Sequence, residues 1–499
     1  MTHTKPQTSF LVLALLALAG CATGTDVKSV DNAQPMHQHG EQSVKKDICA
    51  PNTVPSSLCS ETATATFDSK GVLWVTWVNN GIIYVQSSSD KSLTFTAPVK
   101  VNAVAEQVAA KGESRPKIKI DNNGTVYLTW DLTLDKKRST YIRFSRSTDG
   151  GQHFSEPVTV NDNLEVIRHR FNSLAIGKNG EIFIAWLDAR DLEPAKKAGK
   201  AFKGLSLYYT WSDDGGKHFH PGKSVADQAC ECCRIDTAIA KDNTPVIVWR
   251  HIFEGKIRDH AIVKFKDWNT PGPVTRLSRE NWEIDACPHH GPALSISYTD
   301  TYHAVWFSNA ESKQGLFYAY SKDAGQHFSE PFNFGKAGAS HPHVLGLGRQ
   351  VAVVWQEFDG KNNSIQVIKS ADEGKTWTQP EALAQSTEMI DEPFLVSDGH
   401  GIYLSWQSAQ QGYQLKRLKY PASAASAAGR QVEGWVTVHF TIQTDGSVDD
   451  AVVVDAEPKG IFDDAALKAI SKWKFKAKIV NGIAVTQRAV QKLQFVLDN

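Results

Sequence analysis

The chain has 499 residues, with 54 basic and 54 acidic side chains that give a formal net charge of +0. The chain therefore lacks the excess of basic residues that is typical of nucleic-acid-binding proteins, and this excludes that class of partner. The only apolar run of membrane interest lies at the N-terminus, so integral membrane proteins are excluded as well. Fourteen Trp, 35 Gly and 10% aromatic residues favour a β-rich chain with many turns.

The first twenty residues have the layout of an export signal. Lys5 supplies a positive charge, and Phe10 to Ala19 form an apolar run of about ten residues, too short to cross a bilayer. The run ends in Leu18-Ala19-Gly20-Cys21, which resembles the lipobox of bacterial lipoproteins. The resemblance implies that Cys21 becomes the lipidated first residue, whereas the alternative is an ordinary cleaved signal with a chance cysteine.

The residue after Cys21 is Ala22 rather than Asp, which by analogy favours anchoring at the outer membrane on its periplasmic side. Residues 21–60 are polar and low in aromatics, and we interpret them as a tether that follows the signal peptide, residues 1–20. The mature protein is therefore expected to be lipid-anchored in the bacterial envelope and to fold in an oxidising compartment.

Seven internal repeats follow, each marked by a short apolar strand that ends in Trp. The Trp residues lie 49 to 63 positions apart, and each unit contains further strand-like runs and turns. Repeats of this kind predict an all-β propeller, with seven blades favoured and six possible. The strands are Leu73–Trp77, Val126–Trp130, Ile182–Trp186, Pro245–Trp249, Tyr302–Trp306, Val351–Trp355 and Ile402–Trp406.

The last unit, Glu392 to Tyr420, shows no evident fourth strand. Ring closure is then expected either to borrow a strand from residues before Glu61 or to leave this unit partial. We assign residues 61–420 to the propeller.

Most units carry a second shared segment, in which Ser, Asp, Gly and an aromatic residue recur at fixed spacing. The Asp side chain can hold a tight hairpin by accepting backbone N–H groups, and Gly permits positive φ. These segments resemble the Asp-boxes (S-x-D-x-G-x-x-W/F) of sialidases and related BNR-repeat propellers, which implies a sialidase-like fold but says little about activity. The clear copies are Ser147–Phe154, Ser212–Phe219, Ser321–Phe328 and Ser370–Trp377, with a degenerate one at Ser88–Phe95.

The innermost strand of a propeller blade begins near the mouth of the central channel, and counting back 14 to 16 residues from each Trp locates that start. The arginines found in this way, with His341, are candidates for binding an anionic ligand such as a glycan, because guanidinium groups bind carboxylate, phosphate or sulfate bidentately. The alternative is that the arginines pair with glutamates across the channel. The positions are Glu61, Arg115, Arg170, Arg234, His290, His341 and Glu392.

Arg115, Arg170 and Arg234 are similar in kind to the arginine triad with which sialidases bind the sialic acid carboxylate. This resemblance makes an exo-α-sialidase-type glycoside hydrolase an alternative function. Such an enzyme also needs a Tyr nucleophile supported by a Glu, with an Asp acid/base, and no Tyr stands in register at a blade start. Asp188, Asp191 and Glu283 are acidic candidates that nothing in the sequence selects, so catalytic residues stay unknown.

The cysteines fall into two sets once Cys21 is set apart. Cys49 and Cys59 flank a ten-residue loop and are predicted to form a disulfide. The others belong to two motifs at the same blade position, so we expect their Cys and His side chains to be neighbours at the channel mouth. These residues are Cys230, Cys232, Cys233, Cys287, His289 and His290.

Two interpretations of this Cys/His cluster stay open, with a redox role as a third. Four cysteines in an exported protein most often form two disulfides, which here would rigidify the rim of the pocket. Cys232 and Cys233 are adjacent and would be strained if bonded to each other, so bonds to Cys287 or Cys230 are expected. Alternatively, thiolates and imidazoles, with Met36–His39 of the tether, form a copper or zinc site. Periplasmic copper or zinc handling is therefore a further alternative function.

The pattern of the C-terminal part predicts a separate small α+β domain. Residues 421–430 form a linker of small residues, and residues 431–499 show two strands, an amphipathic helix from Phe462 to Trp473 and a last strand from Gln491 to Leu497. This ββαβ plan, with Gly460–Asp463, Ala465–Leu467 and Trp473–Phe475, resembles the C-terminal domain of TonB-family energy transducers.

In that family the domain binds outer-membrane receptors by adding a strand to their short N-terminal peptide. The sequence shows no uncleaved N-terminal transmembrane helix and no long Pro-rich span, so we expect docking rather than energy transduction; the alternative is a structural cap with no partner. The sequence therefore predicts an envelope-anchored lipoprotein whose propeller binds an anionic glycan or a metal-bound ligand. Its TonB-like domain would dock to an outer-membrane receptor or transport system.

Overall fold

The computed structural model describes Cys49 and residues 53–134, 138–200, 204–388, 390–420, 434–458, 462–480 and 483–495. The expected signal peptide, the lipidation site Cys21, the His-containing segment Met36–His39 and the linker lie outside the described residues. Within the described ranges, no helix combines the length and apolar character needed to cross a membrane.

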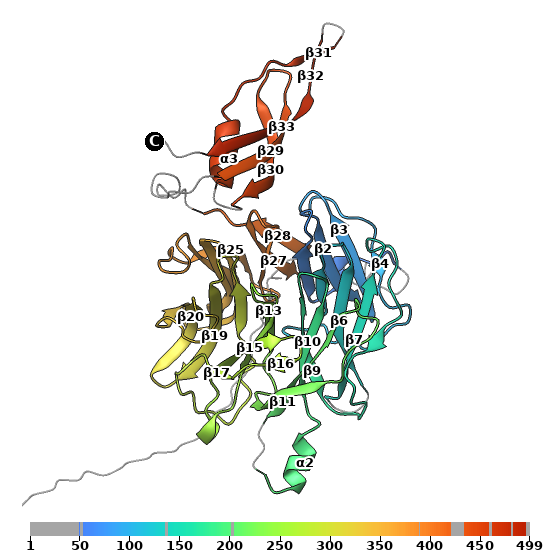
Figure 1. Ribbon diagram of the computed structural model, residues 1–499, viewed down its shortest axis with the longest axis vertical. Coiled ribbons are helices and arrows are strands. Elements are labelled where there is room, and N and C mark those ends of the chain that lie inside the picture. Colours follow the sequence, from blue (N-terminus) through green and yellow to red (C-terminus); the bar gives the residue numbers. More distant parts are fainter. Residues whose placement is uncertain are drawn as a thin grey trace, which may run out of the picture. The chain divides into compact units, whose positions relative to one another are not determined.

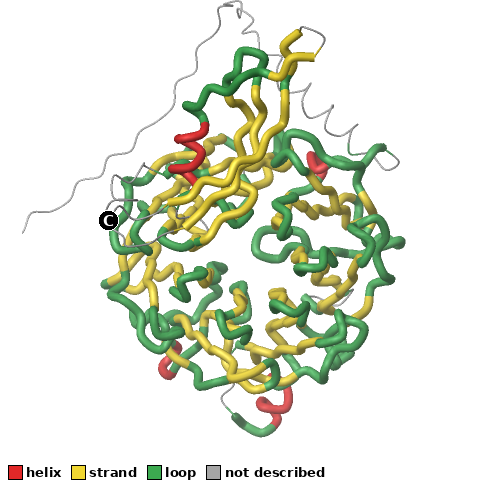
Figure 2. The backbone as a smooth tube through the Cα atoms, turned by 45° about the horizontal axis from the view of Figure 1, so that its top comes forward, coloured by secondary structure: helices red, strands yellow, loops and turns green. Residues whose placement is uncertain are grey.

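Seven antiparallel sheets are arranged radially about one axis (Figure 2). The first strands of successive sheets lie side by side, so the first strand of each sheet is the innermost. The sheets are the blades of a propeller, and the prediction of an all-β propeller with seven blades is confirmed.

Figure 1 labels many of the strands. Blade 1 contains β1 (Ala63–Phe67), β2 (Leu73–Asn79), β3 (Ile82–Ser88) and β4 (Val99–Lys100). Blade 2 contains β5 (Lys117–Ile120), β6 (Val126–Thr133), β7 (Thr140–Ser147) and β8 (Val158–Thr159). Blade 3 contains β9 (His169–Ile176), β10 (Ile182–Asp188), β11 (Leu205–Ser212) and β12 (Lys223–Ala229), with helix α2 (Leu192–Lys197) between β10 and β11. Blade 4 contains β13 (Asp236–Ile239), β14 (Pro245–Arg250), β15 (His260–Asp267), β16 (Thr270–Pro271) and β17 (Thr275–Arg276), and the 3-10 turn η2 (Glu254–Lys256) precedes β15.

Blade 5 contains β18 (Ala293–Ile296), β19 (Tyr302–Ala310), β20 (Lys313–Ser321) and β21 (Phe332–Phe334). Blade 6 contains β22 (Ala339–Leu347), β23 (Gln350–Phe358), β24 (Asn363–Ser370) and β25 (Glu381–Ser386). Blade 7 contains β26 (Phe394–Ser397), β27 (Ile402–Ser408) and β28 (Gly412–Arg417).

The repeated Trp residues stand on the second strand of each blade and pack between blades. Six of them are almost completely buried, and Trp406 is partly buried. Each hydrophobic cluster of the propeller draws its side chains from two neighbouring blades, the last cluster joining blade 1 to Tyr413 of blade 7. The core is therefore a ring of layers between sheets, and each layer depends on the contact between two repeats.

The Ser-x-Asp-x-Gly segments form tight hairpins between the third and fourth strands of their blades. In blade 2, the Ser147 hydroxyl donates to Asp149 Oδ1 at 2.8 Å and accepts the Gly151 N–H at 2.9 Å. Asp149 Oδ1 also accepts the His153 N–H at 3.0 Å. Gly151 has φ of 81°, and a Cβ atom there would lie 2.6 Å from the Trp74 ring, so the glycine is required by both conformation and space.

Among the described residues, no segment before Glu61 adds a strand to blade 7. Residues Ser57–Cys59 form a 3-10 turn, η1, instead of a fourth strand for blade 7. The Gln407 side chain of β27 donates to the backbone oxygens of Ser57 and Ser60, at 2.5 and 3.1 Å. Lys91 of blade 1 donates to Asp398 and Tyr403 of blade 7, at 2.7 and 2.8 Å. Side chains rather than a shared sheet therefore hold the first and last blades together.

The structure also contains a disulfide between Cys49 and Cys59, with an S–S distance of 2.08 Å. This is the pair that the sequence predicts, and it links the described part of the tether to η1.

The C-terminal domain is a three-stranded antiparallel sheet with one helix. The sheet order is β30 (Val448–Glu457), β29 (Gly434–Ile442) and β33 (Gln487–Phe495), and β31 (Lys478–Val480) pairs with β32 (Ile483–Val485) as a separate hairpin. Helix α3 (Asp463–Ile470) contacts β29 and β30. The α+β plan predicted for this domain is confirmed, and so is a hairpin before the last strand, which the sequence predicts at Asn481-Gly482.

Two predicted boundaries in this domain were wrong. The helix ends at Ile470 rather than Trp473, because the N–H groups of Lys472 and Trp473 bond back only three residues, in a 3-10 turn that ends the helix. The last strand begins at Gln487 rather than Gln491, because β33 pairs with β29 along its whole length.

A core substitution tests the layered packing. Trp249 is fully buried between blades 3 and 4. Trp249→Ala is expected to lower the free energy of unfolding by about 3–5 kcal/mol, because it removes a large apolar contact and leaves a cavity. Chemical denaturation followed by circular dichroism would measure the loss. Leu93→Ala, at an exposed position, is the control, expected to change stability by less than about 0.5 kcal/mol; equal effects of the two variants would contradict the packing.

Candidate functional site

The channel residues located by counting stand at or within three positions of the first strand of each blade. Arg115, Arg234 and Glu392 each lie two residues before their strands, whereas Arg170 and His341 lie inside β9 and β22. The starts of the innermost strands were thus found from the Trp spacing alone. Which side chains meet at those starts depends on the fold.

Arg115 is buried and fully engaged. Its guanidinium forms a bidentate ion pair with Asp391, at 2.7 and 2.6 Å. It also donates to the backbone oxygens of Gly112 and Ala63, at 2.8 and 3.3 Å. Burial raises the pKa of Asp391 to about 6, against the opposing charge of Arg115.

Arg234 is buried among carboxylates and carbonyl groups. Its Nη1 lies 3.5 Å from both Glu113 Oε1 and Glu392 Oε2. Its Nη2 donates to the Pro342 oxygen at 2.8 Å, and its backbone N–H donates to Glu113 Oε2 at 3.0 Å. For Arg115 and Arg234, the geometry is that of arginines paired with acids across the channel.

His341 completes this channel cluster, which we define as Arg234, Glu113, Glu392 and His341. Its Nδ1 lies 3.3 Å from Glu392 Oε1 and 3.6 Å from Glu113 Oε1, and its ring centre is 4.7 Å from that of His290. Burial disfavours the charged imidazole, but the two carboxylates outweigh it and raise the pKa of His341. Burial also acts to raise the pKa of Glu113, but His341 and Arg234 lower it to about 2.

Arg170 lies apart from the channel cluster. Its guanidinium is half-buried and stacks on the Phe171 ring at 4.2 Å, and within the described part of the chain it forms no hydrogen bond or ion pair. The three arginines therefore do not converge on one point as a triad. Two of them are paired with carboxylates, and Arg170 keeps its charge available.

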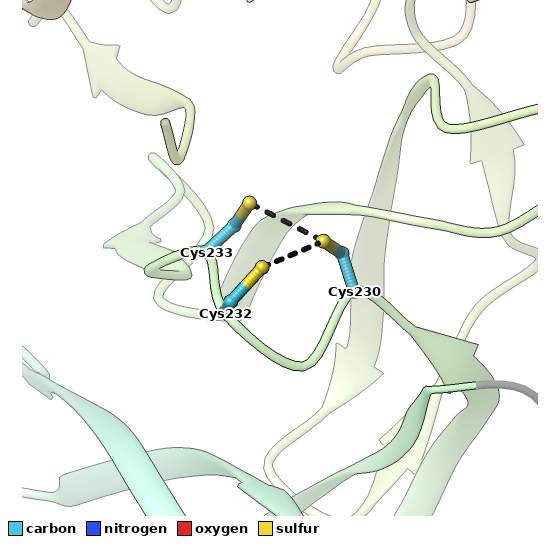
Figure 3. Close-up of side chains that lie close together, drawn as sticks. All are labelled: Cys230, Cys232 and Cys233. Atoms are coloured by element: carbon cyan, nitrogen blue, oxygen red, sulfur yellow. Dashed lines mark hydrogen bonds between the residues drawn. The ribbon is translucent and has the colours of Figure 1, made fainter. Parts of the chain in front are cut away.

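Three cysteines of the expected Cys/His cluster do converge (Figure 3). Cys230 Sγ lies 3.6 Å from Cys232 Sγ and 3.3 Å from Cys233 Sγ. Their exposed fractions are 1%, 4% and 1%. The chain turns inward between β12 and β13, and this turn buries all three thiols in one thiol cluster.

The remaining members of the expected cluster lie elsewhere. Cys287 is exposed, and its sulfur lies 3.9 Å from Glu231 Oε1; all four cysteines are free thiols, so no disulfide joins Cys287 to the others. His289 is exposed, and the His290 ring packs against His341 and Phe307. The loop that carries Cys287 and His289 lies at the surface. Cys287 contacts the turn through Glu231, but its sulfur is not among the three that converge.

Charge near the thiol cluster favours one thiolate. Arg258 Nη1 donates to Cys230 Sγ at 3.1 Å. Hydrogen bonds from Cys232 and Cys233, with the charges of Arg250 and Arg258, hold the pKa of Cys230 well below its usual value. The same sharing of protons with Cys230 raises the pKa of Cys232, whereas burial chiefly raises that of Cys233. Of the three thiols, Cys230 is therefore the one whose charged form the surroundings favour most.

A hollow that the sequence reasoning missed lies at the other ends of the innermost strands. It has a volume of about 550 Å³, and the ends of β5, β9, β13 and β18 line it. A repeated signal was present, because the same strand end carries Ile in blades 2 to 5, followed within two positions by a charged or polar residue in all four. The lining includes Ile120, Ile176, Ile239, Ile296, Asp121, Lys178 and Lys241.

Comparison with known proteins shows a sequence family that the C-terminal segment matches. Residues 416–497 match the family described as "Gram-negative bacterial TonB protein C-terminal". Over 82 residues the chain is 33% identical to protein TonB of Pseudomonas aeruginosa, which covers 16% of this chain and 24% of that protein. The chain thus spans about a quarter of the length of this relative. A TonB-like domain fits a protein of the bacterial cell envelope.

Solved structures similar to the propeller are distant. The Hadza microbial sialidase Hz136 is 13% identical, with a TM-score of 0.41 over 70% of this chain and 76% of that one. A protein of unknown function from Dyadobacter fermentans is 14% identical, with a TM-score of 0.44 over 72% and 97%. An intramolecular trans-sialidase from Ruminococcus gnavus is 10% identical, with a TM-score of 0.42 over 62% and 95%. Similarity at this level carries no information on activity.

Two members of the channel cluster make stability depend on pH in opposite directions: the lowered pKa of Glu113 acts at acidic pH, and the raised pKa of His341 acts near neutral pH. A raised pKa of His341 in the folded state stabilises the protein below the unfolded value of about 6.5, and this stabilisation is lost as pH rises through the folded value. Asp391, with its pKa raised to about 6, acts in the same direction at lower pH. His341→Gln is expected to reduce the loss of stability between pH 6.5 and 8, by at most about 1.4 kcal/mol per pH unit.

Denaturant titrations at several pH values would measure this slope. His220→Gln, at an exposed histidine, is the control and should leave the slope as it is in the unmodified protein. A slope that is unchanged in His341→Gln would show that the two carboxylates do not hold the proton.

Proposed function

We propose that this chain is a lipoprotein, anchored through Cys21, whose C-terminal domain docks to the periplasmic segment of an outer-membrane receptor. The receptor segment would bind as an additional strand of the domain's sheet. The observation that carries the proposal is the edge strand β33 of a domain that matches the TonB C-terminal family.

The strand β33 offers a regular edge. All nine of its residues pair in unbroken register with β29, and in the described part of the chain no strand pairs with its other side. Its side chains alternate, with Leu493 and Phe495 packing against the domain core and Val490 exposed. A strand of this kind presents a row of unpaired backbone groups to an extended peptide.

The opposite edge, β30, is less suited to this role. Its register with β29 shifts twice, between Thr437 and Val438 and between His439 and Thr441. Such bulges twist an edge strand and interrupt the spacing that a partner strand needs. Helix α3 also contacts β30. We therefore assign peptide binding to β33.

Two valines allow a matched test of this assignment. Val490 on β33 and Val452 on β30 pair with the same residue, His439, and their exposed fractions are 60% and 43%. Val490→Asp is expected to weaken binding of a receptor peptide at least tenfold, because it places a charge where the added strand would lie. Fluorescence anisotropy with labelled peptides from the N-terminal segments of the bacterium's outer-membrane receptors would measure it on the full chain.

Val452→Asp is the control and should change the affinity less than twofold. Hydrogen exchange tests the same assignment without any substitution. Peptide binding should slow the exchange of amides in residues 487–495 and leave those of residues 448–457 unchanged. An equal loss of peptide affinity in the two variants, or no binding to any receptor peptide, would contradict the proposed docking role.

For the propeller we propose a binding role for an anionic glycan, centred on Arg170. The specific observation in its favour is that Arg170 is charged, half-buried and without a carboxylate partner among the described residues, unlike Arg115 and Arg234. The exo-sialidase alternative needs several arginines free for one carboxylate. Because two of the three are paired with acids, binding is favoured over hydrolysis.

An array of sialylated and uronic-acid oligosaccharides would test this second role. Arg170→Ala is expected to reduce retention on acidic glycans at least tenfold, and Arg279→Ala, at an exposed arginine, should have little effect. Release of sialic acid from a reporter glycoside by the unmodified protein would instead support the enzyme. If the unmodified protein neither binds acidic glycans nor releases sialic acid, the proposed glycan-binding role is wrong.

A further inference from the structure

The thiol cluster lies beside two buried arginines that have no acidic partner. Arg250 bonds through its guanidinium only to the backbone oxygens of Arg258, His290 and Phe307, and its Nε has no hydrogen-bond partner. Arg258 bonds to the Ile284 oxygen and to Cys230 Sγ. In the part of the chain that the structure describes, neither guanidinium pairs with a carboxylate. Buried charges without a counter-charge are costly, so negative charge is needed here.

The thiols are the groups placed to supply that charge. The Cys230 N–H donates to the Arg250 oxygen at 2.8 Å, which joins the Cys230–Cys233 turn directly to β14. The sulfur atoms of the three cysteines all lie within 4.8 Å of one another. Three sulfurs that each stood roughly 2.3 Å from one metal ion would be roughly 4 Å apart. The sulfur triangle is therefore close to the size that a shared ion requires.

We propose that Cys230, Cys232 and Cys233 form a three-thiolate binding site for a soft monovalent cation, cuprous copper. Three thiolates and one such ion have a net charge of −2, which balances the two guanidinium charges of Arg250 and Arg258. This inference is independent of the docking role of the C-terminal domain. The site adds a metal-binding property to the propeller at blades 3 and 4.

The donor set favours copper(I) over zinc. Structural zinc is bound by four ligands in a tetrahedron, and among the described residues the cluster contains three sulfurs and no fourth donor. The nearest carboxylate in sequence, Glu231, is engaged in an ion pair with Arg168. A zinc ion would also leave one positive charge uncompensated. Thiolates are soft ligands that suit cuprous copper as well as zinc, so the ligand number and the charge balance decide between the two.

The alternative of a disulfide within the cluster fits the charges poorly. A bond between Cys230 and Cys233 would remove two of the three sulfurs as possible anions and form a neutral group. Arg250 and Arg258 would then face a single remaining thiol. Copper binding instead needs no oxidant: the ion replaces the protons that the three thiols still carry, these protons leave to solvent, and no electron is transferred.

The test uses the full chain, reduced and kept free of oxygen, titrated with copper(I) in competition with a chromophoric cuprous chelator. One copper ion per chain is expected, with three sulfur neighbours in X-ray absorption. Cys232→Ser is expected to weaken copper binding at least 100-fold. Cys287→Ser is the matched control, since Cys287 is an exposed thiol outside the cluster, and it should bind copper as the unmodified chain does.

A second pair of variants tests the charge argument and covers the case in which Cys232→Ser does not fold. Arg258→Met should weaken copper binding at least tenfold, whereas Arg279→Met, at an exposed arginine, should not. The proposal is overturned if the reduced chain binds no copper, if it binds zinc more tightly in the same competition format, or if Cys232→Ser and Cys287→Ser weaken binding equally.

Discussion

The buried ion pair between Arg115 and Asp391 joins both ends of the propeller ring. Arg115 precedes the first strand of blade 2 and Asp391 precedes that of blade 7, while the same guanidinium donates to Ala63 of blade 1. One side chain thus fixes three blades at the place where, in the part of the chain that the structure describes, no shared sheet closes the ring. A buried pair of this kind is costly to form, but removal of one partner leaves an uncompensated charge, with a penalty of about 3–5 kcal/mol.

The interior of the propeller contains two kinds of arginine environment. Arg115 and Arg234 face carboxylates, so their charge is used in holding the channel together. Arg250 and Arg258 face backbone oxygens and sulfur. The same residue type therefore stabilises the ring in one place and requires an anionic partner in another. The distinction depends on the partner, which is why a count of arginines near the channel does not identify a ligand.

The sequence predicts the fold well because its signal is periodic. Every blade repeats a strand that ends in Trp, and the distance from that Trp to the start of the innermost strand is nearly constant, so Arg115, Arg234 and His341 were placed correctly at the channel. Of their partners, Glu392 was among the counted positions, but Glu113 and Asp391 were not identified. Glu113 and Asp391 lie just beside counted positions, and only the tertiary arrangement brings them against the arginines.

For the thiol cluster, too, only part of the site could be predicted from the sequence. The motif from Cys230 to Arg234 indicated that these thiols would be close together, and the structure places them so. Arg250, which directly follows a buried Trp in β14, belongs to this site but has no recognisable motif. Cys287 and His289 had the expected spacing, yet their loop lies at the surface. Contacts within one turn were predictable from sequence, and contacts between loops of different blades were not.

The separation between Arg115 and Asp391 has a consequence for how the protein is made. The two residues are 276 positions apart, and the early blades leave the ribosome long before the partner of Arg115 exists. At about 5–20 residues per second, roughly 14–55 s pass between synthesis of the two residues. For that interval a guanidinium that is buried in the finished ring stays exposed, and the first and last blades can meet only when the chain is nearly complete.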